Sequence, residues 1–313
     1  MKIYRILYGA LGAALLAGAF FTGDYGLSDE NIKIYEDALA LQEQVDELGF
    51  EQFNLNEYKV RFYDGNVDYV VKGNDVNKEE AVFTTFVGTT YKIDGEYQVI
   101  LPTVENFAEM YKLLGTAGSL AEGEVNFTED EYGSAEHIAA LWHEAAHAYQ
   151  MTYYQDEILS LIEGKVSVEN IEDVIVSAVD SNEDVVKLYQ KQMGILNKAY
   201  ITTDLSEKKA YIESYLEMET ERRELLDEEA CAVEDYYEAA EGTARYIESH
   251  VYRFQEGQEA FEREYTNETE YQKGSGKYYS MGMLKCCLLD ELNPGWKDNY
   301  DFSVTLTELL EAL

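Results

Sequence analysis

The spacing of apolar residues along the chain changes near residue 134. Before that point, four short segments alternate apolar and polar positions, as strands do. Each pair of segments flanks an Asp-Gly dipeptide, which favours a hairpin. The pairs are Tyr58 to Tyr63 with Val67 to Lys72, and Thr84 to Ile93 with Tyr97 to Leu101. Helices are expected from about Asp29 to Leu48, capped by Ser28, and from Thr103 to about Leu114.

From Ser134 onward the apolar spacing is helical almost throughout. The predicted helices span residues 134–153, 156–163, 168–178, 182–200, 206–250 (as two helices), 256–266, 278–292 and 303–312. We therefore expect an α+β fold. In it, a small mixed or antiparallel β-sheet layer with helices, over residues 24–133, precedes a mostly helical subdomain over residues 134–313.

Composition and charge narrow the classes of partner. The chain has 313 residues, of which 46% are hydrophobic, enough for a sizeable core. Its formal net charge of −38 disfavours nucleic acid and anionic membrane surfaces as partners, because both carry phosphate. No linker rich in proline, serine or glycine divides it, so we expect one large domain or two intimate subdomains.

The first residues are typical of an export signal. Lys2 and Arg5 precede an apolar run from Ile6 to Phe21, which ends in an Ala17-Gly18-Ala19 cleavage box. The run is shorter than the about 20 residues that a membrane-spanning helix needs, which favours cleavage over an uncleaved anchor. Residues 1–23 therefore predict a protein that is secreted, or tethered by this segment to the outer face of the membrane.

The cysteines and the glycosylation sequons add little to the functional prediction. Cys231, Cys286 and Cys287 allow one disulfide between two predicted helices, but buried free thiols are an equal expectation. Asn126-Phe127-Thr128 and Asn267-Glu268-Thr269 match the glycosylation sequon, which matters only in a eukaryotic source.

The strongest chemical signal is His143-Glu144-Ala145-Ala146-His147, an HExxH pentad in an apolar helical run. Histidines four positions apart share a helix face, so both rings can bind one zinc ion. Glu144 would lie beside the ion and could take a proton from the attacking water. With 4 histidines and 62 acidic residues, roughly 0.01 chance matches are expected. The alternative is a pair of helix histidines satisfied by neighbouring carboxylates.

A catalytic zinc site needs a third protein ligand. Gln150 and Tyr153 stand where a metzincin would have glycine and histidine, which excludes that class. Val166 stands where a short, thermolysin-like spacing would put glutamate. Glu163 and Glu169 are the nearby alternatives.

Farther along, Glu241-Gly242-Thr243-Ala244-Arg245-Tyr246 matches an E-G-x-A-x-Y segment position for position. That segment is found in the aminopeptidase branch of the gluzincins, which are HExxH zinc metallopeptidases of the zincin superfamily, and the chain resembles them. The resemblance implies a zincin-like fold with Glu241 as the third zinc ligand. Gly242 would let two helices approach closely around the ion.

A second segment, Tyr279-Ser280-Met281-Gly282, is similar to the Y-x-x-G segment of the same enzymes. The resemblance implies that Tyr279 faces the metal and stabilises an oxyanion, with Tyr278 as the competing candidate. The chain also departs from the pattern, because 94 positions separate His147 from Glu241 and no G-A-M-E-N type segment is present. The matching motifs cover about thirty residues, so fold and chemistry are implied but substrate specificity is not.

Other acids lie near the face of Glu241. Glu248, seven residues later, returns to that face and could orient a ligand histidine. A solvated acidic stripe is an equal expectation for Glu248 and the favoured interpretation for Glu234 and Glu238.

These residues predict a secreted, zinc-dependent metallopeptidase that acts on a peptide or protein substrate. Zn²⁺ would be held by His143, His147 and Glu241, with Glu144 as the general base. His137 and His250 lie off the ligand faces and are expected to be structural or exposed. The alternative is a non-catalytic extracellular binding or surface module that retains a zincin fold.

Overall fold

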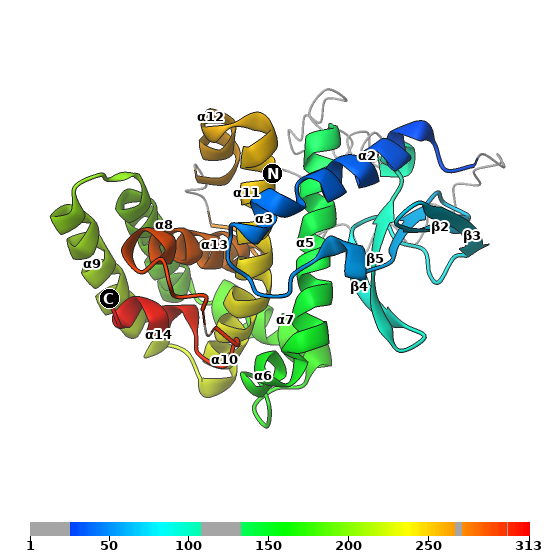
Figure 1. Cartoon of the computed structure of the whole chain (residues 1–313). Coiled ribbons are helices and arrows are strands. Elements are labelled where there is room, and N and C mark those ends of the chain that lie inside the picture. The colour runs from blue at the N-terminus through cyan, green and yellow to red at the C-terminus, as the bar shows by residue number, and fades with distance from the viewer. Residues whose placement is uncertain (1–25, 108–132, 267–270, 299) are drawn as a thin grey trace, which may run out of the picture. The chain divides into compact units, whose positions relative to one another are not determined.

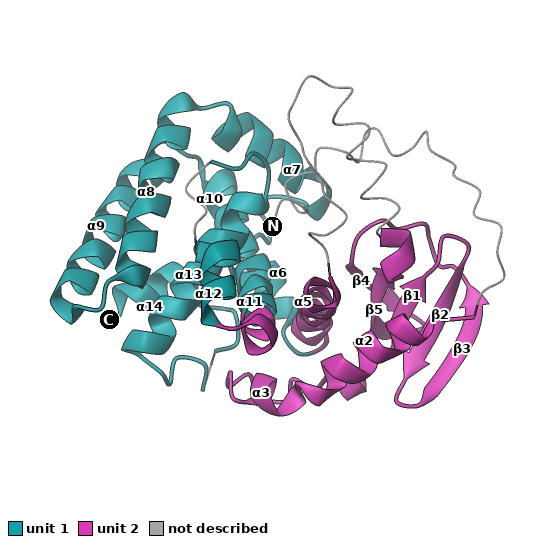
Figure 2. Ribbon diagram, turned by 90° about the horizontal axis from the view of Figure 1, so that it is seen from above, with its two compact units in different colours: residues 1–11, 153–249, 258–313 teal, residues 12–152, 250–257 magenta. Residues whose placement is uncertain are grey.

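The computed structural model describes residues 26–107, 133–266, 271–298 and 300–313, and it divides into two compact units (Figures 1 and 2). The sheet unit comprises the described parts of residues 12–152 and residues 250–257. The helical unit comprises the described parts of residues 153–249 and 258–313. The chain is an α+β protein that is mostly helical, as the apolar pattern predicts.

The sheet unit contains a five-stranded mixed sheet in the order β3-β2-β1-β5-β4. Its strands are β1 (Val60–Tyr63), β2 (Val67–Lys72), β3 (Asp75–Glu80), β4 (Thr89–Ile93) and β5 (Glu96–Pro102). β1 and β5 are parallel, and the other neighbours are antiparallel. Both predicted hairpins are confirmed, and at the second turn Asp94 and Gly95 adopt the positive φ angles that such a turn requires.

Two features of the sheet differ from the sequence-based expectation. β4 begins at Thr89 rather than at Thr84. β3 was not predicted, because all six of its residues are exposed and therefore show no apolar alternation. It is an edge strand, and its charged side chains protect that edge from pairing with another chain.

The helices of the sheet unit are α2 (Asp29–Ala40), α3 (Gln42–Asp46), the short 3₁₀ turn η2 (Leu55–Glu57) and α5 (Ser134–Tyr153). Ser28 caps α2 as predicted, because its hydroxyl accepts a hydrogen bond from the N–H of Asn31. The expected helix over residues 29–48 is broken at Leu41, where α2 ends.

α5 packs within the sheet unit. Its Trp142 is fully buried, donates a hydrogen bond from Nε1 to the carbonyl of Ala38 (3.2 Å) and meets the ring of Phe53 edge-on. His137 stacks on Phe62 of β1. The compact units group α5 with the sheet as far as Thr152, and the subdomain boundary at residue 134 stays a prediction.

The helical unit is built from α-helices interrupted by short π-helical and 3₁₀ segments. These elements are α6 (Gln155–Ser160), η4 (Val168–Asn170), α7 (Ile171–Val174), η5 (Ile175–Asp180), α8 (Glu183–Ile201), α9 (Leu205–Arg223), α10 (Glu228–Tyr237), η6 (Glu238–Gly242), α11 (Thr243–Glu256), α12 (Gln258–Phe261), η7 (Glu262–Thr266), α13 (Gly276–Leu292) and α14 (Leu306–Glu311). The end of α11, from His250 onward, belongs to the sheet unit. The predicted break within 206–250 lies just before Asp227, whose side chain caps α10.

The interior of the helical unit carries charged side chains that pair with one another. Glu234 and Glu238 are 2% and 4% exposed, so the expected solvated stripe is wrong for both. The Arg222 guanidinium donates to Glu234, and the Lys285 ammonium donates to Glu238. Each buried acid therefore has a cationic partner from another helix, as burial of a charge requires.

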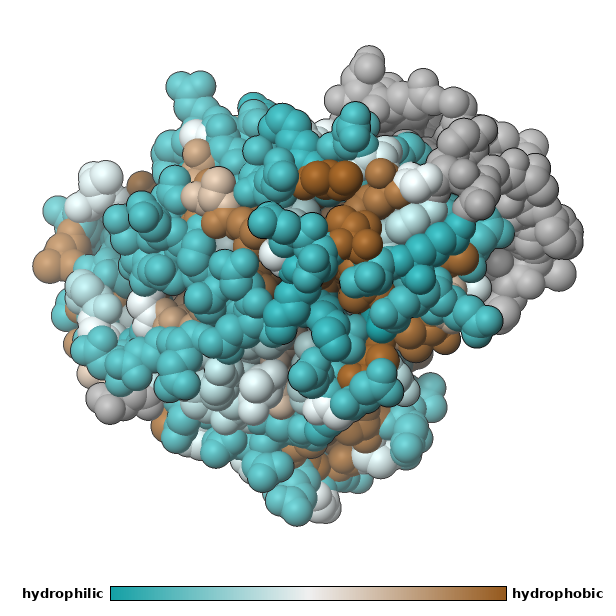
Figure 3. Space-filling view, turned by 45° about the vertical axis from the view of Figure 1, so that its right-hand side comes forward, coloured by the Kyte–Doolittle hydropathy of each residue, from teal (hydrophilic) through white to brown (hydrophobic). Residues whose placement is uncertain are grey.

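The remaining predictions about the chain as a whole have mixed outcomes. The three cysteines are free thiols, and Cys286 and Cys287 are buried. No helix in the described ranges is long and apolar enough to cross a membrane. The predicted signal or anchor at 1–23, the sequons at Asn126 and Asn267, and most of the helix expected after Thr103 lie outside the described residues. The visible surface is largely hydrophilic, as the net charge implies (Figure 3).

Candidate metal centre

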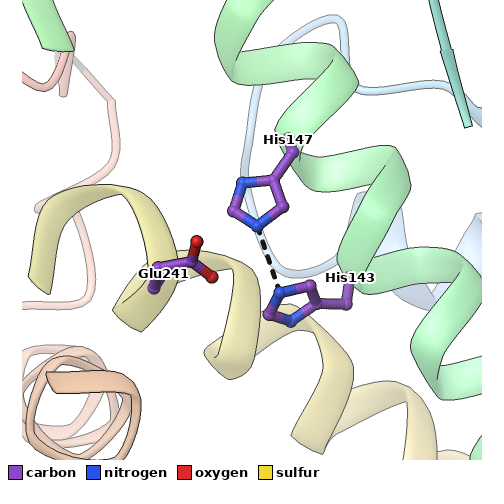
Figure 4. A group of neighbouring side chains, drawn as sticks. All are labelled: His143, His147 and Glu241. Atoms are coloured by element: carbon purple, nitrogen blue, oxygen red, sulfur yellow. Dashed lines mark hydrogen bonds between the residues drawn. The ribbon is translucent and has the colours of Figure 1, made fainter. Parts of the chain in front are cut away.

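His143 and His147 lie one turn apart on α5, and their rings face each other (Figure 4). Their Nε2 atoms are 3.1 Å apart, with the ring planes 80° from parallel. Two nitrogen ligands of one tetrahedral zinc ion, each about 2.05 Å from the metal, would be about 3.3 Å apart. The histidine pair thus already has the separation that a shared zinc ion needs.

Gln150 fixes the tautomer of His147. Its side-chain oxygen lies 2.9 Å from Nδ1 of His147, and Gln150 is only 1% exposed. An amide oxygen only accepts, so Nδ1 of His147 carries the proton and Nε2 presents a lone pair. This is the arrangement that a metal ligand requires. Sequence analysis considered Gln150 only as evidence against metzincins, although its spacing of three from His147 places both on one helix face.

Glu241 is the acid that completes this group. Among the described residues, the histidines, cysteines and acids that could hold a metal ion form one group, consisting of His143, His147 and Glu241. One ligand atom from each lies within 4.8 Å of the other two. Figure 4 draws these three side chains.

Glu241 lies in η6, a π-helical turn between α10 and α11. A π turn inserts one extra residue into a helix and so changes the direction of the side chains that it carries, often at functional sites. The Thr243 hydroxyl donates to the carbonyl of Ala239 (2.6 Å), which satisfies a backbone acceptor in the widened turn. Tyr236 lies close by, and burial together with the negative charge of Glu241 raises the pKa of Tyr236 to about 12.

Gly242 has a different packing partner from the one expected. A Cβ atom on Gly242 would lie 2.5 Å from the Cα of Gly282, so the close approach is between η6 and α13. The expectation that this glycine serves a close approach of two helices is confirmed. The partner is the helix that carries Tyr279 rather than the helix of the histidines.

Glu144 is buried on α5, 7% exposed, and is contacted from the sheet. The Thr90 hydroxyl of β4 donates to the main-chain carbonyl of Glu144 (2.6 Å) and lies 3.3 Å from its carboxyl oxygen Oε2. Gly88 leaves no room for a side chain here, because its Cβ would lie 2.8 Å from Oε1 of Glu144. No local pattern in the sequence predicts the contacts of Gly88 and Thr90 with Glu144, since both residues lie more than fifty positions before it.

The two tyrosine candidates have different surroundings. Tyr278 is fully buried, its hydroxyl lies 3.3 Å from Glu234, and its ring stacks on Tyr237. Burial raises the pKa of Tyr278 well above its usual value. These contacts account for Tyr278 as part of the interior of the helical unit. Tyr279 is 6% exposed, and its role as an oxyanion donor stays a prediction.

The structure also locates the remaining acidic candidates. The Glu248 carboxylate accepts from the Arg245 guanidinium and from the Tyr265 hydroxyl (3.2 Å), and its orienting role toward a histidine stays a prediction. Glu163 and Glu169 are exposed and lie outside the group that could hold a metal.

The two remaining histidines are buried. His250 is 5% exposed. His137 is completely buried, and this burial lowers its pKa to about 4, although a hydrogen bond to the carbonyl of Pro102 opposes the shift. His137 is therefore neutral and structural.

No model of a protein family, no curated protein and no solved structure matches the chain. Its functional interpretation therefore depends on the motifs and on the geometry of the site.

Proposed function

We propose that the protein is a zinc-dependent metallopeptidase of the gluzincin type, with a zincin-like fold. The observation that carries the proposal is the meeting of two facing Nε2 atoms, one distant carboxyl oxygen and one further acid on the histidine helix. Two imidazoles and one carboxylate form a ligand set of catalytic zinc sites, and three protein ligands leave a position open. Imidazole ligands also favour zinc over magnesium or calcium, which prefer oxygen.

The residues present have the roles that peptide hydrolysis needs. A zinc ion held by His143, His147 and Glu241 would supply Lewis acidity and lower the pKa of water. Glu144 would accept the proton of the attacking water at its carboxylate and pass it to the leaving amine. Tyr279 would donate a hydrogen bond to the carbonyl oxygen as it gains negative charge.

The substrate class proposed is a peptide or a protein. The net charge of −38 supports cationic rather than phosphate-bearing partners. Export by the N-terminal segment, with release or with tethering to the outer face of the membrane, is part of the same proposal.

The test compares the wild-type protein with Glu144→Gln and with Glu136→Gln, a control on the first turn of α5. Hydrolysis of casein and of a mixed peptide library is measured together with zinc content. We expect one zinc per chain in all three proteins and a loss of at least about 100-fold in hydrolysis for Glu144→Gln alone. Undiminished hydrolysis by Glu144→Gln would refute the assignment. Zinc binding without hydrolysis by the wild type would favour the non-catalytic module.

A further inference from the structure

An ion pair inside the helical unit holds the turn that carries Glu241. Lys285 of α13 is completely buried, and its Nζ lies 2.5 Å from Oε2 of Glu238. The same ammonium donates to the Thr307 hydroxyl (2.6 Å) and lies 3.6 Å from Glu219. Lys285 therefore has three polar partners from three different elements, which defines its position.

Glu238 is the first residue of η6, and Glu241 lies three positions later in the same turn. At the end of η6, Gly242 lies against Gly282 of α13. One turn farther on, the Tyr246 hydroxyl donates to Asp290, near the end of α13. α13 thus holds this stretch of helix before, at and after the position of Glu241.

Burying the Lys285–Glu238 ion pair costs free energy, which argues that the pair has a specific role in the fold. Removing a lysine and a glutamate from water costs several kcal/mol per ion, and apolar residues of similar volume are often as stable or more stable. A π turn is a rare departure from the regular helix, so its surroundings must favour it over the regular form. A buried charge pair has a defined geometry, whereas an apolar contact at this position would let the turn relax.

We propose that Lys285 is a positioning residue for the metal site: it pairs with Glu238 and so holds η6 in the conformation in which Glu241 would serve as a metal ligand. This inference depends on the proposed function, because it gives Lys285 a role only if Glu241 is a metal ligand.

The helical unit contains a matched control. Lys277, also on α13, is 1% exposed, and its Nζ lies 2.9 Å from Oδ1 of Asp180. Asp180 is the last residue of η5, another π-helical segment, so two buried lysines of one helix each pair with an acid of a π-helical segment; Asp180 is half-buried, whereas Glu238 is buried. The Lys277 pair supports a segment that carries none of the proposed ligands.

The experiment measures zinc dissociation constants by competition with a chromogenic chelator, and stability by urea unfolding, for the wild type, Lys285→Met, Lys277→Met and Glu241→Gln. Both lysine variants leave a buried acid without its cation, so both lose stability. We expect the zinc dissociation constant to rise about tenfold for Lys285→Met and to stay within about twofold for Lys277→Met. Glu241→Gln sets the scale for loss of a ligand.

A double variant separates positioning from folding. Glu238→Gln combined with Lys285→Met removes both charges of the pair, and Glu219 keeps Arg223 as its cation (3.5 Å), so stability recovers. The pairing that holds η6 is still absent, so zinc binding stays weak. Zinc affinity that returns with stability, or that falls equally in Lys277→Met, would overturn the inference while leaving the metal site intact. A wild-type protein that binds zinc no better than Glu241→Gln would overturn the proposed function and the inference with it.

Discussion

Gly242 and Gly282 meet backbone to backbone. A Cβ on either residue would lie 2.5 Å or 2.6 Å from the facing Cα, well inside van der Waals contact. Gly242 follows the candidate ligand Glu241, and Gly282 lies three residues after Tyr279. Two segments that are some forty residues apart and were recognised separately are therefore packed against each other, and a change at either glycine displaces both.

Replacement of Gly242 by alanine should destabilise the helical unit. The added methyl group would lie between two backbones that cannot rotate away, and such overpacking costs about 3 kcal/mol. Urea unfolding measures the loss. Gly194→Ala is the control, because Gly194 lies within α8 with no atom in reach of a Cβ, and this change should stabilise by about 0.5 to 1 kcal/mol. Equal effects of the two changes would contradict the packing described.

Removal of the Gln150 side chain should weaken zinc binding. Gln150→Ala takes away the acceptor that holds the proton of His147 on Nδ1, and loss of such a partner raises the metal dissociation constant about 10-fold to 100-fold. Chelator competition measures this change. Gln150→Glu keeps an acceptor at the same place and should retain wild-type affinity; a glutamate variant as weak as the alanine variant would argue against this role.

The Thr90 hydroxyl should matter for catalysis and not for metal binding. Thr90→Val removes the donor to the main chain and carboxylate of Glu144, and we expect kcat on a peptide substrate to fall about tenfold. Thr152→Val is the control, because Thr152 lies on α5, the helix that carries Glu144. The hydrogen bond described for its hydroxyl goes to the carbonyl of Ala148, four residues earlier. A loss of zinc in Thr90→Val, with kcat per bound zinc unchanged, would contradict the assignment.

His137 should make the folded protein sensitive to acid. Its pKa falls from 6.5 to about 4 because burial disfavours the charged ring. Between these values the unfolded chain binds a proton that the folded chain does not, so the free energy of unfolding decreases as the pH falls, by about 3 kcal/mol in full. Urea unfolding at pH 7 and pH 4.5 measures the slope. His137→Gln keeps a donor for Pro102 and should have a shallower slope; an unchanged slope would show that other groups cause it.

Local patterns sufficed to predict several parts of the molecule. The Asp-Gly turns, with alternating residues on both sides, predicted two hairpins, and the HExxH spacing predicted that His143 and His147 face one point. The grouping of Glu241 with them follows from the motif match, since no periodicity connects residues 94 positions apart.

Other parts of the fold have no signal in the local sequence. A π turn adds one residue to a helix, and a pattern with a period of 3.6 does not reveal one extra residue. Glu238 looked like a member of a solvated stripe because its partner Lys285 lies 47 residues later. In a chain with 62 acidic residues, a buried acid cannot be told from an exposed one until its cation is known.

The most direct test of the metal site is anomalous X-ray scattering at the zinc edge from crystals of the protein grown with zinc. We predict one strong peak at about 2.0 to 2.2 Å from Nε2 of His143, Nε2 of His147 and a carboxyl oxygen of Glu241. A peak elsewhere, or a zinc ion on the histidine pair with Glu241 beyond bonding distance, would contradict the account.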